Sequence, residues 1–156
     1  MNVYFSLGSN LGDKESILEK AIFLLDKKIG KCFSRSSFYQ TEPWGFESRN
    51  SFLNACCICE TNLSPLKILE ITQQIEKELG RKQKSLDHHY TDRPIDIDLL
   101  LIDDLILEDP ILTLPHPLMH KRTFVLEPLN EIAPDVIHPV LKQTISQLLE
   151  NLKLSF

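Results

Sequence analysis

Two aspartates separated by a single residue form the sharpest chemical feature of the sequence. Asp96 and Asp98 lie in the run RPIDIDLLL of residues 93–101. Alternate side chains of an extended strand share one face, with their Cα atoms roughly 7 Å apart. Carboxylates at this spacing can lean together on one or two hard cations, and a pair of Mg²⁺ ions can hold the attacking and leaving oxygens of a phosphoryl transfer. The run therefore predicts a Mg²⁺ site, and the flanking Arg93 suits a polyphosphate substrate.

The alternative interpretation is a half-buried strand whose two aspartates lie on a solvated face. Aspartate is uncommon in strands, and carboxylates that share a face repel each other. Both observations are easier to understand if a cation neutralises the pair.

An aromatic ring and an amide stand together in a second candidate site. Phe52 and Asn54 share one face of a predicted strand, and the loop TEPWG of residues 41–45 precedes it. The ring can stack on a flat heterocycle, while the amide can read an edge that carries a donor and an acceptor. In the alternative interpretation, Phe52 belongs to the core and Asn54 satisfies the end of a neighbouring strand.

Basic side chains follow in a third group. His116, Lys121 and Arg122 can all donate hydrogen bonds to phosphate oxygens. His116 and His120 are four residues apart, which would also suit two metal ligands on a helix, but Pro117 argues against a regular helix there. Ordinary solvated charge is the alternative for Lys121.

The hydrophobic pattern predicts the elements that position these residues. We expect strands over residues 3–7, 32–41, 51–62 and 95–102, a return strand over 105–107, and helices over 18–29, 64–79 and 145–152. Residues 109–139 hold six of the nine prolines and should be mostly loop and short helical turns. The order β-α-β-β-α-β, followed by a hairpin and a C-terminal helix, predicts an α+β fold of the ferredoxin-like kind. Its antiparallel sheet would have helices packed on one face.

Length and composition bound the class of protein. The chain has 156 residues, so we expect a single domain over residues 1–156. A hydrophobic fraction of 42% and a charged fraction of 25% exclude a disordered chain. The net charge of −5 argues against nucleic acid or an acidic membrane as a partner. No apolar run is long enough for a membrane span, and the first residues lack a secretory signal, so we expect a cytoplasmic protein.

The four cysteines are expected to be buried free thiols. They are Cys32, Cys56, Cys57 and Cys59, and no two of them form a CxxC pair. Cys56 and Cys57 would point to opposite faces of a strand, so they cannot bind the same metal ion. Zinc and disulfide interpretations are therefore weak.

Taken together in their order, these segments resemble the 6-hydroxymethyl-7,8-dihydropterin pyrophosphokinase family along nearly the whole chain. The matching segments are LGSNLG (7–12), SFYQTEPWG (37–45), FLNA (52–55), EKELGR (76–81), RPIDID (93–98), PHP (115–117) and RTFVLEPL (122–129). Each segment alone is only suggestive, but their joint order and spacing are highly specific. The family has the ferredoxin-like fold that the element order predicts.

The resemblance implies an ATP- and Mg²⁺-dependent enzyme of folate biosynthesis. It would transfer the pyrophosphoryl group of ATP to the hydroxymethyl oxygen of the pterin and release AMP. Two Mg²⁺ ions would be held by Asp96 and Asp98, and Asp98 is the candidate acceptor of the hydroxyl proton. The residues expected to contact the pterin are Thr41, Pro43, Trp44, Phe52, Asn54 and Phe124. Those expected on the nucleotide and its phosphates are Gln73, Glu76, Arg81, Tyr90, Arg93, His116 and Arg122, with Arg81 and Arg93 also counted as catalytic.

Two other functions compete with this interpretation. One is a different two-metal nucleotidyl transferase or nuclease that uses the same carboxylates, although the acidic balance disfavours a polynucleotide substrate. The other is a non-catalytic small-molecule sensor on the same fold, which would not need the carboxylate pair. We further expect a monomer, and a loop over residues 82–92 that orders when both substrates bind.

Overall fold

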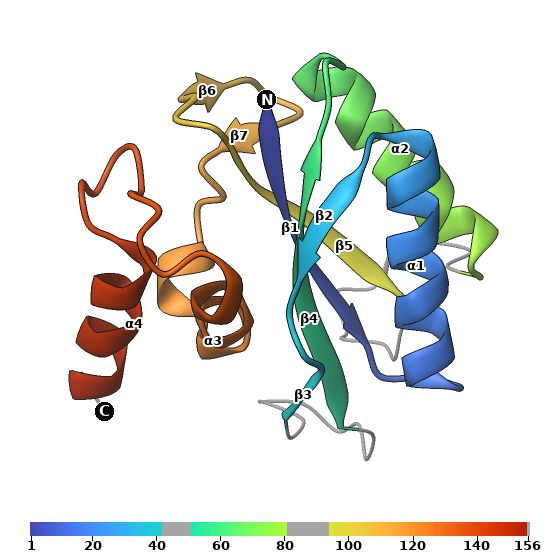
Figure 1. Cartoon of the computed structure of the whole chain (residues 1–156), viewed down its shortest axis with the longest axis horizontal. Helices are drawn as coiled ribbons and strands as arrows, with labels where there is room; N and C mark the ends of the chain where they lie inside the picture. Colours follow the sequence, from blue (N-terminus) through green and yellow to red (C-terminus); the bar gives the residue numbers. More distant parts are fainter. Residues whose placement is uncertain (42–50, 81–93, 156) are drawn as a thin grey trace.

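An antiparallel sheet runs through the centre of the structure, a computed structural model that describes residues 1–41, 51–80 and 94–155. Its strands lie in the order β2-β4-β1-β5, and a further strand, β3, also pairs with β4 (Figure 1). Their bounds are β1 (Asn2–Ser9), β2 (Cys32–Arg35), β3 (Tyr39–Thr41), β4 (Phe52–Glu60) and β5 (Asp96–Ile102). The two long central strands, β1 and β4, therefore carry β5 on one side and the shorter strands on the other.

Two helices cover one face of this sheet, α1 (Lys14–Lys28) and α2 (Pro65–Glu78) (Figure 1). Asp13 caps the first helix by accepting a hydrogen bond from Ser16 N–H, and Ser64 caps the second through Lys67 N–H. The apolar stripes that the sequence predicts for both helices are buried against the strands. Gly80 follows α2 with a φ of +108°, a backbone conformation that glycine adopts at little cost.

The opposite face is covered as well, by the 3₁₀ turn η1 (Met119–Lys121) and by helices α3 (Thr123–Ile132) and α4 (Ile145–Leu154). A second core lies between these helices and the sheet, with Tyr4, Ile58 and Leu100 among its buried side chains. The expectation of helices on one face only was therefore wrong. Its physical reason is visible in Leu99 and Leu100, adjacent buried residues that point to opposite cores, as expected for strands covered on both faces.

Three local predictions also differ from the structure. The proline-rich region contains the ten-residue helix α3, which keeps a buried Pro128 in its interior. The single strand expected over residues 32–41 is interrupted between β2 and β3, where Ser36 Oγ accepts a hydrogen bond from Cys56 N–H. The return strand is β6 (Leu107–Glu108), which pairs with β7 (Thr113–Leu114) in a separate two-stranded sheet and not with β5. Within the described residues, no helix combines the length and apolar character needed to cross a bilayer.

Candidate active site

One row of residues across three strands forms the base of the candidate site. In the register of the sheet, Gly8 of β1 lies opposite Asn54 of β4 on one side and Asp96 of β5 on the other. Asp98 lies two residues farther along β5, opposite Ser6. The alternation predicted for β5 is confirmed, because Asp96 and Asp98 are both partly exposed while Ile97 between them is buried in the opposite core.

Gly8 matters because it leaves room for the side chains beside it. A Cβ atom at this position would lie 3.1 Å from Asn54 Oδ1 and 3.9 Å from Phe52 Cδ1. The first distance is tighter than an ordinary van der Waals contact, so a larger residue would push the amide away. The LGSNLG segment contains this glycine, but nothing in the sequence alone reveals that it touches Asn54.

The amide of Asn54 is buried and held in place from β3. Its Nδ2 group donates a 2.9 Å hydrogen bond to Thr41 Oγ1, and Thr41 lies opposite Phe52 in the β3–β4 pairing. Asn54 is 3% exposed, so its orientation is set by neighbouring protein groups. Three of the residues expected to contact the pterin are thus brought together at this end of the sheet.

A guanidinium from the C-terminal half of the chain reaches one of the two carboxylates. Arg122 Nη1 lies 3.8 Å from Asp98 Oδ2, and both side chains remain roughly 30% exposed, at 28% and 30%. Arg122 is also the N-cap residue of α3, and its Cζ lies 5.5 Å from the centroid of the Phe124 ring. Because water screens a partly exposed ion pair, this contact adds little to the stability of the fold. Its importance is that it places Arg122 beside Asp98.

His116 is anchored to the strand that carries the aspartates. Its backbone N–H donates a 2.9 Å hydrogen bond to Leu100 O, and its ring Nδ1 accepts a 3.1 Å hydrogen bond from the backbone N–H of Leu118. Burial lowers the pKa of His116, the charge of Arg122 lowers it further, and Asp96 opposes both. The imidazole is therefore neutral at pH 7, and because Nδ1 accepts, its proton resides on Nε2.

The C-terminal turn of α3 forms hydrogen bonds with the segment that leads into β3 and with the first residue of that strand. Glu131 accepts hydrogen bonds from Ser37 N–H at 3.0 Å and 3.1 Å, from Ser37 Oγ at 3.1 Å and from the hydroxyl of Tyr39 at 2.6 Å. The bond to the Glu131 carboxylate raises the pKa of Tyr39 to about 12. These contacts link positions more than 90 residues apart, which sequence spacing cannot reveal.

The two residues expected on α2 occupy different environments. Glu76 is buried, and its Oε2 accepts a 2.8 Å hydrogen bond from Ile97 N–H, so it fixes the start of β5 from behind the aspartates. Gln73 is exposed on the same helix. Both stand on the helix layer opposite the face that carries Asp96 and Asp98.

Five predicted site residues lie outside the described residues, together with the loop of residues 82–92. They are Pro43, Trp44, Arg81, Tyr90 and Arg93. Their contributions stay predictions from the sequence.

The chemistry of the donor set at β5 fits Mg²⁺. Asp96 and Asp98 offer only carboxylate oxygens, which Mg²⁺ prefers, and their partial exposure leaves room for water and phosphate oxygens as further ligands. Among the described residues, Arg122 places one positive charge beside Asp98.

Comparison with known proteins gives a consistent result. The matching family model is described as 7,8-dihydro-6-hydroxymethylpterin-pyrophosphokinase (HPPK), and it matches residues 4–134. A 2-amino-4-hydroxy-6-hydroxymethyldihydropteridine pyrophosphokinase of Porphyromonas gingivalis is 52% identical over 138 residues, which are 88% of this chain and 93% of that protein. The Bacillus subtilis protein of the same name is 42% identical over 134 residues, covering 85% of this chain and 78% of its own length.

Solved structures share the fold. A crystal structure of HPPK-DHPS in complex with substrates superposes with a TM-score of 0.78 at 18% identity and covers 99% of this chain. Wild-type HPPK-DHPS of Plasmodium falciparum gives a TM-score of 0.75 at 18% identity and covers 96% of this chain. This chain spans only 44% of the length of each of those two proteins. At this level of identity, the likeness supports the α+β fold alone.

Proposed function

The chain belongs to the 7,8-dihydro-6-hydroxymethylpterin-pyrophosphokinase family, and we propose that its reaction takes place on the sheet face that carries Asp96 and Asp98. The family reaction transfers a pyrophosphoryl group from ATP to the hydroxymethyl group of the dihydropterin, with release of AMP, in folate biosynthesis. Membership of this family decides against the two competing functions, a different two-metal nucleotidyl transferase or nuclease and a non-catalytic small-molecule sensor. The observation that carries the proposed location is the row Asn54–Gly8–Asp96, which joins an amide suited to a heterocycle to a carboxylate suited to a phosphate-bound cation.

Asp96 and Asp98 are the proposed ligands of two Mg²⁺ ions. When bound, the ions supply positive charge that neutralises the phosphate oxygens of ATP. The carboxylates of Asp96 and Asp98 face the same side of β5 because successive side chains of a strand alternate between its two faces. Glu76 accepts a hydrogen bond from the backbone N–H of Ile97, which lies between them. Asp98 is also the proposed acceptor of the pterin hydroxyl proton.

Arg122 and His116 are the proposed phosphate contacts in the described part of the chain. Arg122 stands beside Asp98 and offers the planar fork of donors that suits phosphate oxygens. His116 offers its Nε2–H as a neutral donor, because its Nδ1 already accepts from Leu118. Arg81 and Arg93 are proposed to join them, as the family resemblance implies.

Phe52 and Phe124 are proposed to hold the pterin ring between them, while Asn54 binds its polar edge. The support is that Asn54 and Phe52 both flank Gly8 and that Phe124 follows Arg122 in the first turn of α3. Thr41 fixes the amide through its 2.9 Å hydrogen bond. Pro43 and Trp44 are proposed to complete this side through their backbone.

The proposed contacts to the rest of the nucleotide are Gln73, Glu76 and Tyr90. Glu76 already binds the backbone of Ile97, so it would reach the nucleotide only with its remaining acceptor capacity. We also propose that the enzyme works as a cytoplasmic monomer on small-molecule substrates, without a nucleic acid or membrane partner. Size-exclusion chromatography with light scattering tests the monomer directly.

Pterin-dependent release of AMP from ATP tests the proposed function and its location together. Asp96→Asn and Asp98→Asn should each lower this rate by about 10²-fold or more, because each removes charge at the transferring phosphates. Asp104→Asn is the matched control, since Asp104 is exposed in the turn after β5. Wild-type enzyme without pterin-dependent AMP release would contradict the function. Full activity in both site variants would contradict only the location.

The cation requirement is measured separately. Titration of Mg²⁺ in the presence of a non-hydrolysable ATP analogue should give tight binding to wild type and weaker binding to Asp98→Asn. Single-turnover rates at saturating Mg²⁺ then isolate the role of Asp98 as proton acceptor. An unchanged rate under those conditions would remove Asp98 from that role and leave it as a ligand.

A further inference from the structure

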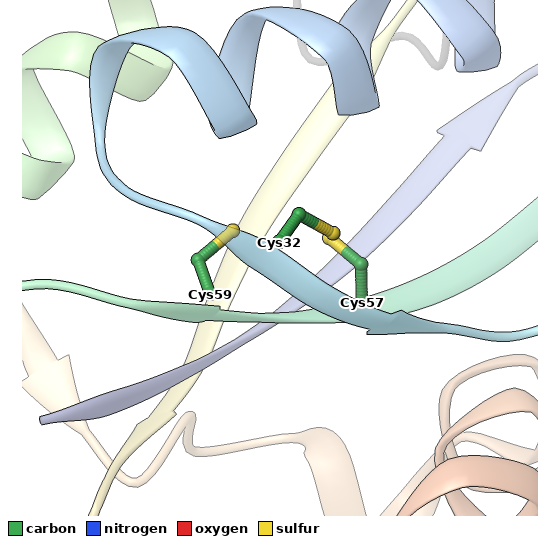
Figure 2. Close-up of side chains that lie close together, drawn as sticks. All are labelled: Cys32, Cys57 and Cys59. Atoms are coloured by element: carbon green, nitrogen blue, oxygen red, sulfur yellow. The ribbon is translucent and has the colours of Figure 1, made fainter.

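Three cysteines converge at the edge of the sheet away from the proposed catalytic face. Cys32 lies on the edge strand β2, and Cys57 and Cys59 lie on the neighbouring strand β4 (Figure 2). Their three Sγ atoms all lie within 4.8 Å of one another. The thiols point toward the α1 and α2 side of the sheet, where Cys57 and Cys59 belong to the core beneath these helices and Cys32 packs against it.

The backbone sets this convergence through register and alternation. Cys32 lies directly opposite Cys59 in the β2–β4 pairing, and Cys57 shares the face of Cys59 because it is two residues away. Gly30, just before β2, lets the backbone pass close to the end of β4. A Cβ atom at this position would lie 1.9 Å from the carbonyl oxygen of Glu60. The same alternation that sends Cys56 and Cys57 to opposite faces of β4 places Cys57 and Cys59 on one face, a pairing not included in the expectation of separate thiols.

The cluster is enclosed on one side and open on the other. Cys57 and Cys59 are 0% exposed, whereas Cys32 is half-buried and gives the cluster access to solvent. Cys56 points to the opposite core, where its thiol lies 3.6 Å from Val125 O. The chain thus contains three convergent thiols and one buried thiol that is separate from them.

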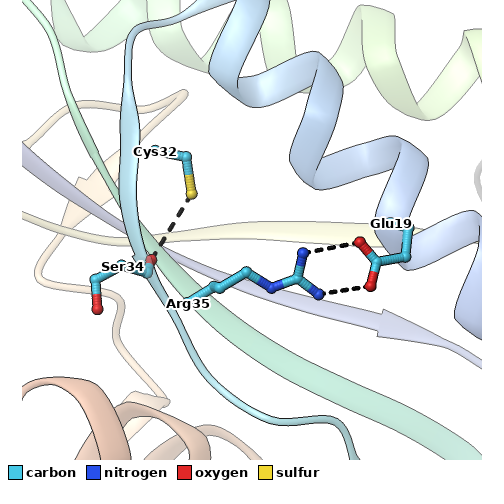
Figure 3. Close-up of polar contacts among 4 residues, drawn as sticks. All are labelled: Glu19, Cys32, Ser34 and Arg35. Carbon is cyan, nitrogen blue, oxygen red and sulfur yellow. Dashed lines mark hydrogen bonds and ion pairs between the residues drawn. The ribbon is translucent and has the colours of Figure 1, made fainter.

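Polar groups surround the half-buried Cys32, including Asp26, whose Oδ1 accepts a 2.8 Å hydrogen bond from the backbone N–H of Cys32. As a thiol it donates to Ser34 O at 3.7 Å, and nearby Arg35 pairs with Glu19 through two bonds of 2.8 Å (Figure 3). A thiolate is the form of cysteine that binds metal ions.

The dimensions also suit a metal ion bound by three sulfurs. Even if every side of the sulfur triangle had the limiting length of 4.8 Å, its centre would lie only about 2.8 Å from each sulfur, a little beyond the roughly 2.3 Å of a thiolate–metal bond. Thiolates select soft ions such as Cu⁺ and Zn²⁺ over the hard Mg²⁺. Cu⁺ can use three sulfurs alone, whereas Zn²⁺ would add water as a fourth ligand on the open side at Cys32.

We propose that Cys32, Cys57 and Cys59 form a thiolate site for one soft d¹⁰ metal ion, independent of the Mg²⁺ chemistry at Asp96 and Asp98. Binding exchanges thiol protons for the ion, and the released protons pass to solvent. No electron is transferred. The bound ion would join β2 to β4 at the edge of the sheet.

Anaerobic titration of reduced, metal-free protein with Cu⁺ and with Zn²⁺, each against a competing chelator, tests the proposal. We expect one ion per chain for at least one of the two metals. Cys32→Ser should lower the affinity at least tenfold, and its half-buried position makes it the thiol whose replacement the fold tolerates best. Cys56→Ser is the matched control and should bind as wild type does.

Two further measurements keep the outcome unambiguous. Bound metal should slow alkylation of Cys32 in wild type, as read by mass spectrometry of the labelled peptide. Asp98→Asn should retain the thiol site, so a failure of the proposed catalytic function leaves this result unaffected. Absence of one-to-one binding by both metals, undiminished binding in Cys32→Ser, or an equal loss in Cys56→Ser would overturn the proposal.

Discussion

Glu76 Oε2 accepts a 2.8 Å hydrogen bond from the backbone N–H of Ile97, the residue that separates Asp96 from Asp98. A buried side chain of α2 thereby fixes the strand whose other face carries the two carboxylates. The contact crosses from the helix layer into the backbone of β5. Positioning of the proposed site thus depends on a residue behind it.

Glu76→Ala should destabilise the protein by about 1–3 kcal/mol, because it leaves the buried Ile97 N–H without this partner. Glu76→Gln keeps an acceptor oxygen and should lose much less. Urea unfolding measures both changes. Glu78→Ala is the control, since Glu78 forms an exposed ion pair with Lys28, whose loss should change the free energy of unfolding by under about 1 kcal/mol. Equal losses in Glu76→Ala and Glu78→Ala would refute the role of the buried contact.

Gly8→Ala should weaken binding of the pterin and leave binding of ATP nearly unchanged. The added Cβ would lie 3.1 Å from Asn54 Oδ1, so the amide must move by a few tenths of an ångström. Calorimetry with each substrate separates the two effects. In the background of Asn54→Ala the same glycine change should have little further effect, because the crowded oxygen is gone. A purely additive double variant would show that the two residues act independently.

Arg122→Gln should raise the pKa of His116, and Asp96→Asn should lower it, because the two charges act on the imidazole in opposite directions. The folded value lies below the ordinary value of about 6.5, so the unfolded chain binds this proton more readily. The stability from the neutral histidine is therefore complete above pH 6.5 and is lost as pH falls through the folded value. NMR titration of the imidazole measures the pKa. Shifts in the reverse directions would contradict the arrangement.

Glu131→Gln should return the pKa of Tyr39 from about 12 toward its ordinary value of 10. The raised pKa means that the folded protein holds the phenol proton more tightly than the unfolded chain. The associated stability is present below pH 10 and is lost as pH rises from 10 to about 12. NMR of the labelled Tyr39 ring reports the midpoint. Tyr4, whose pKa is raised mainly by burial, is the internal control and should not move.

The sequence predicted those parts of the site that follow a local rule. Alternation placed Asp96 and Asp98 on one face, and apolar periodicity predicted both α1 and α2, although α1 begins at Lys14 and not at residue 18. The second core was missed because two-sided burial of a strand such as β5 has no strict period. Its adjacent leucines read equally well as one continuous apolar run.

Contacts between distant segments could not be predicted from spacing. The bond from Ile97 to Glu76 and the bonds from Ser37 to Glu131 depend on how the helices dock, which no local pattern encodes. The convergence of Cys32 with Cys59 required the register of two strands and the missing side chain of Gly30. These are tertiary outcomes that only coordinates reveal.

Helix α3 meets the proposed site at its first turn and the lead into β3 at its last. Arg122 and Phe124 stand at one end, and Glu131 holds Ser37 and Tyr39 at the other. Because this one helix carries both the proposed pterin contact Phe124 and the proposed phosphate contact Arg122, a ligand that displaces its first turn is expected to weaken binding of both substrates. If both proposed contacts hold, substitutions in this turn that exclude such a ligand should also lower the activity of the enzyme.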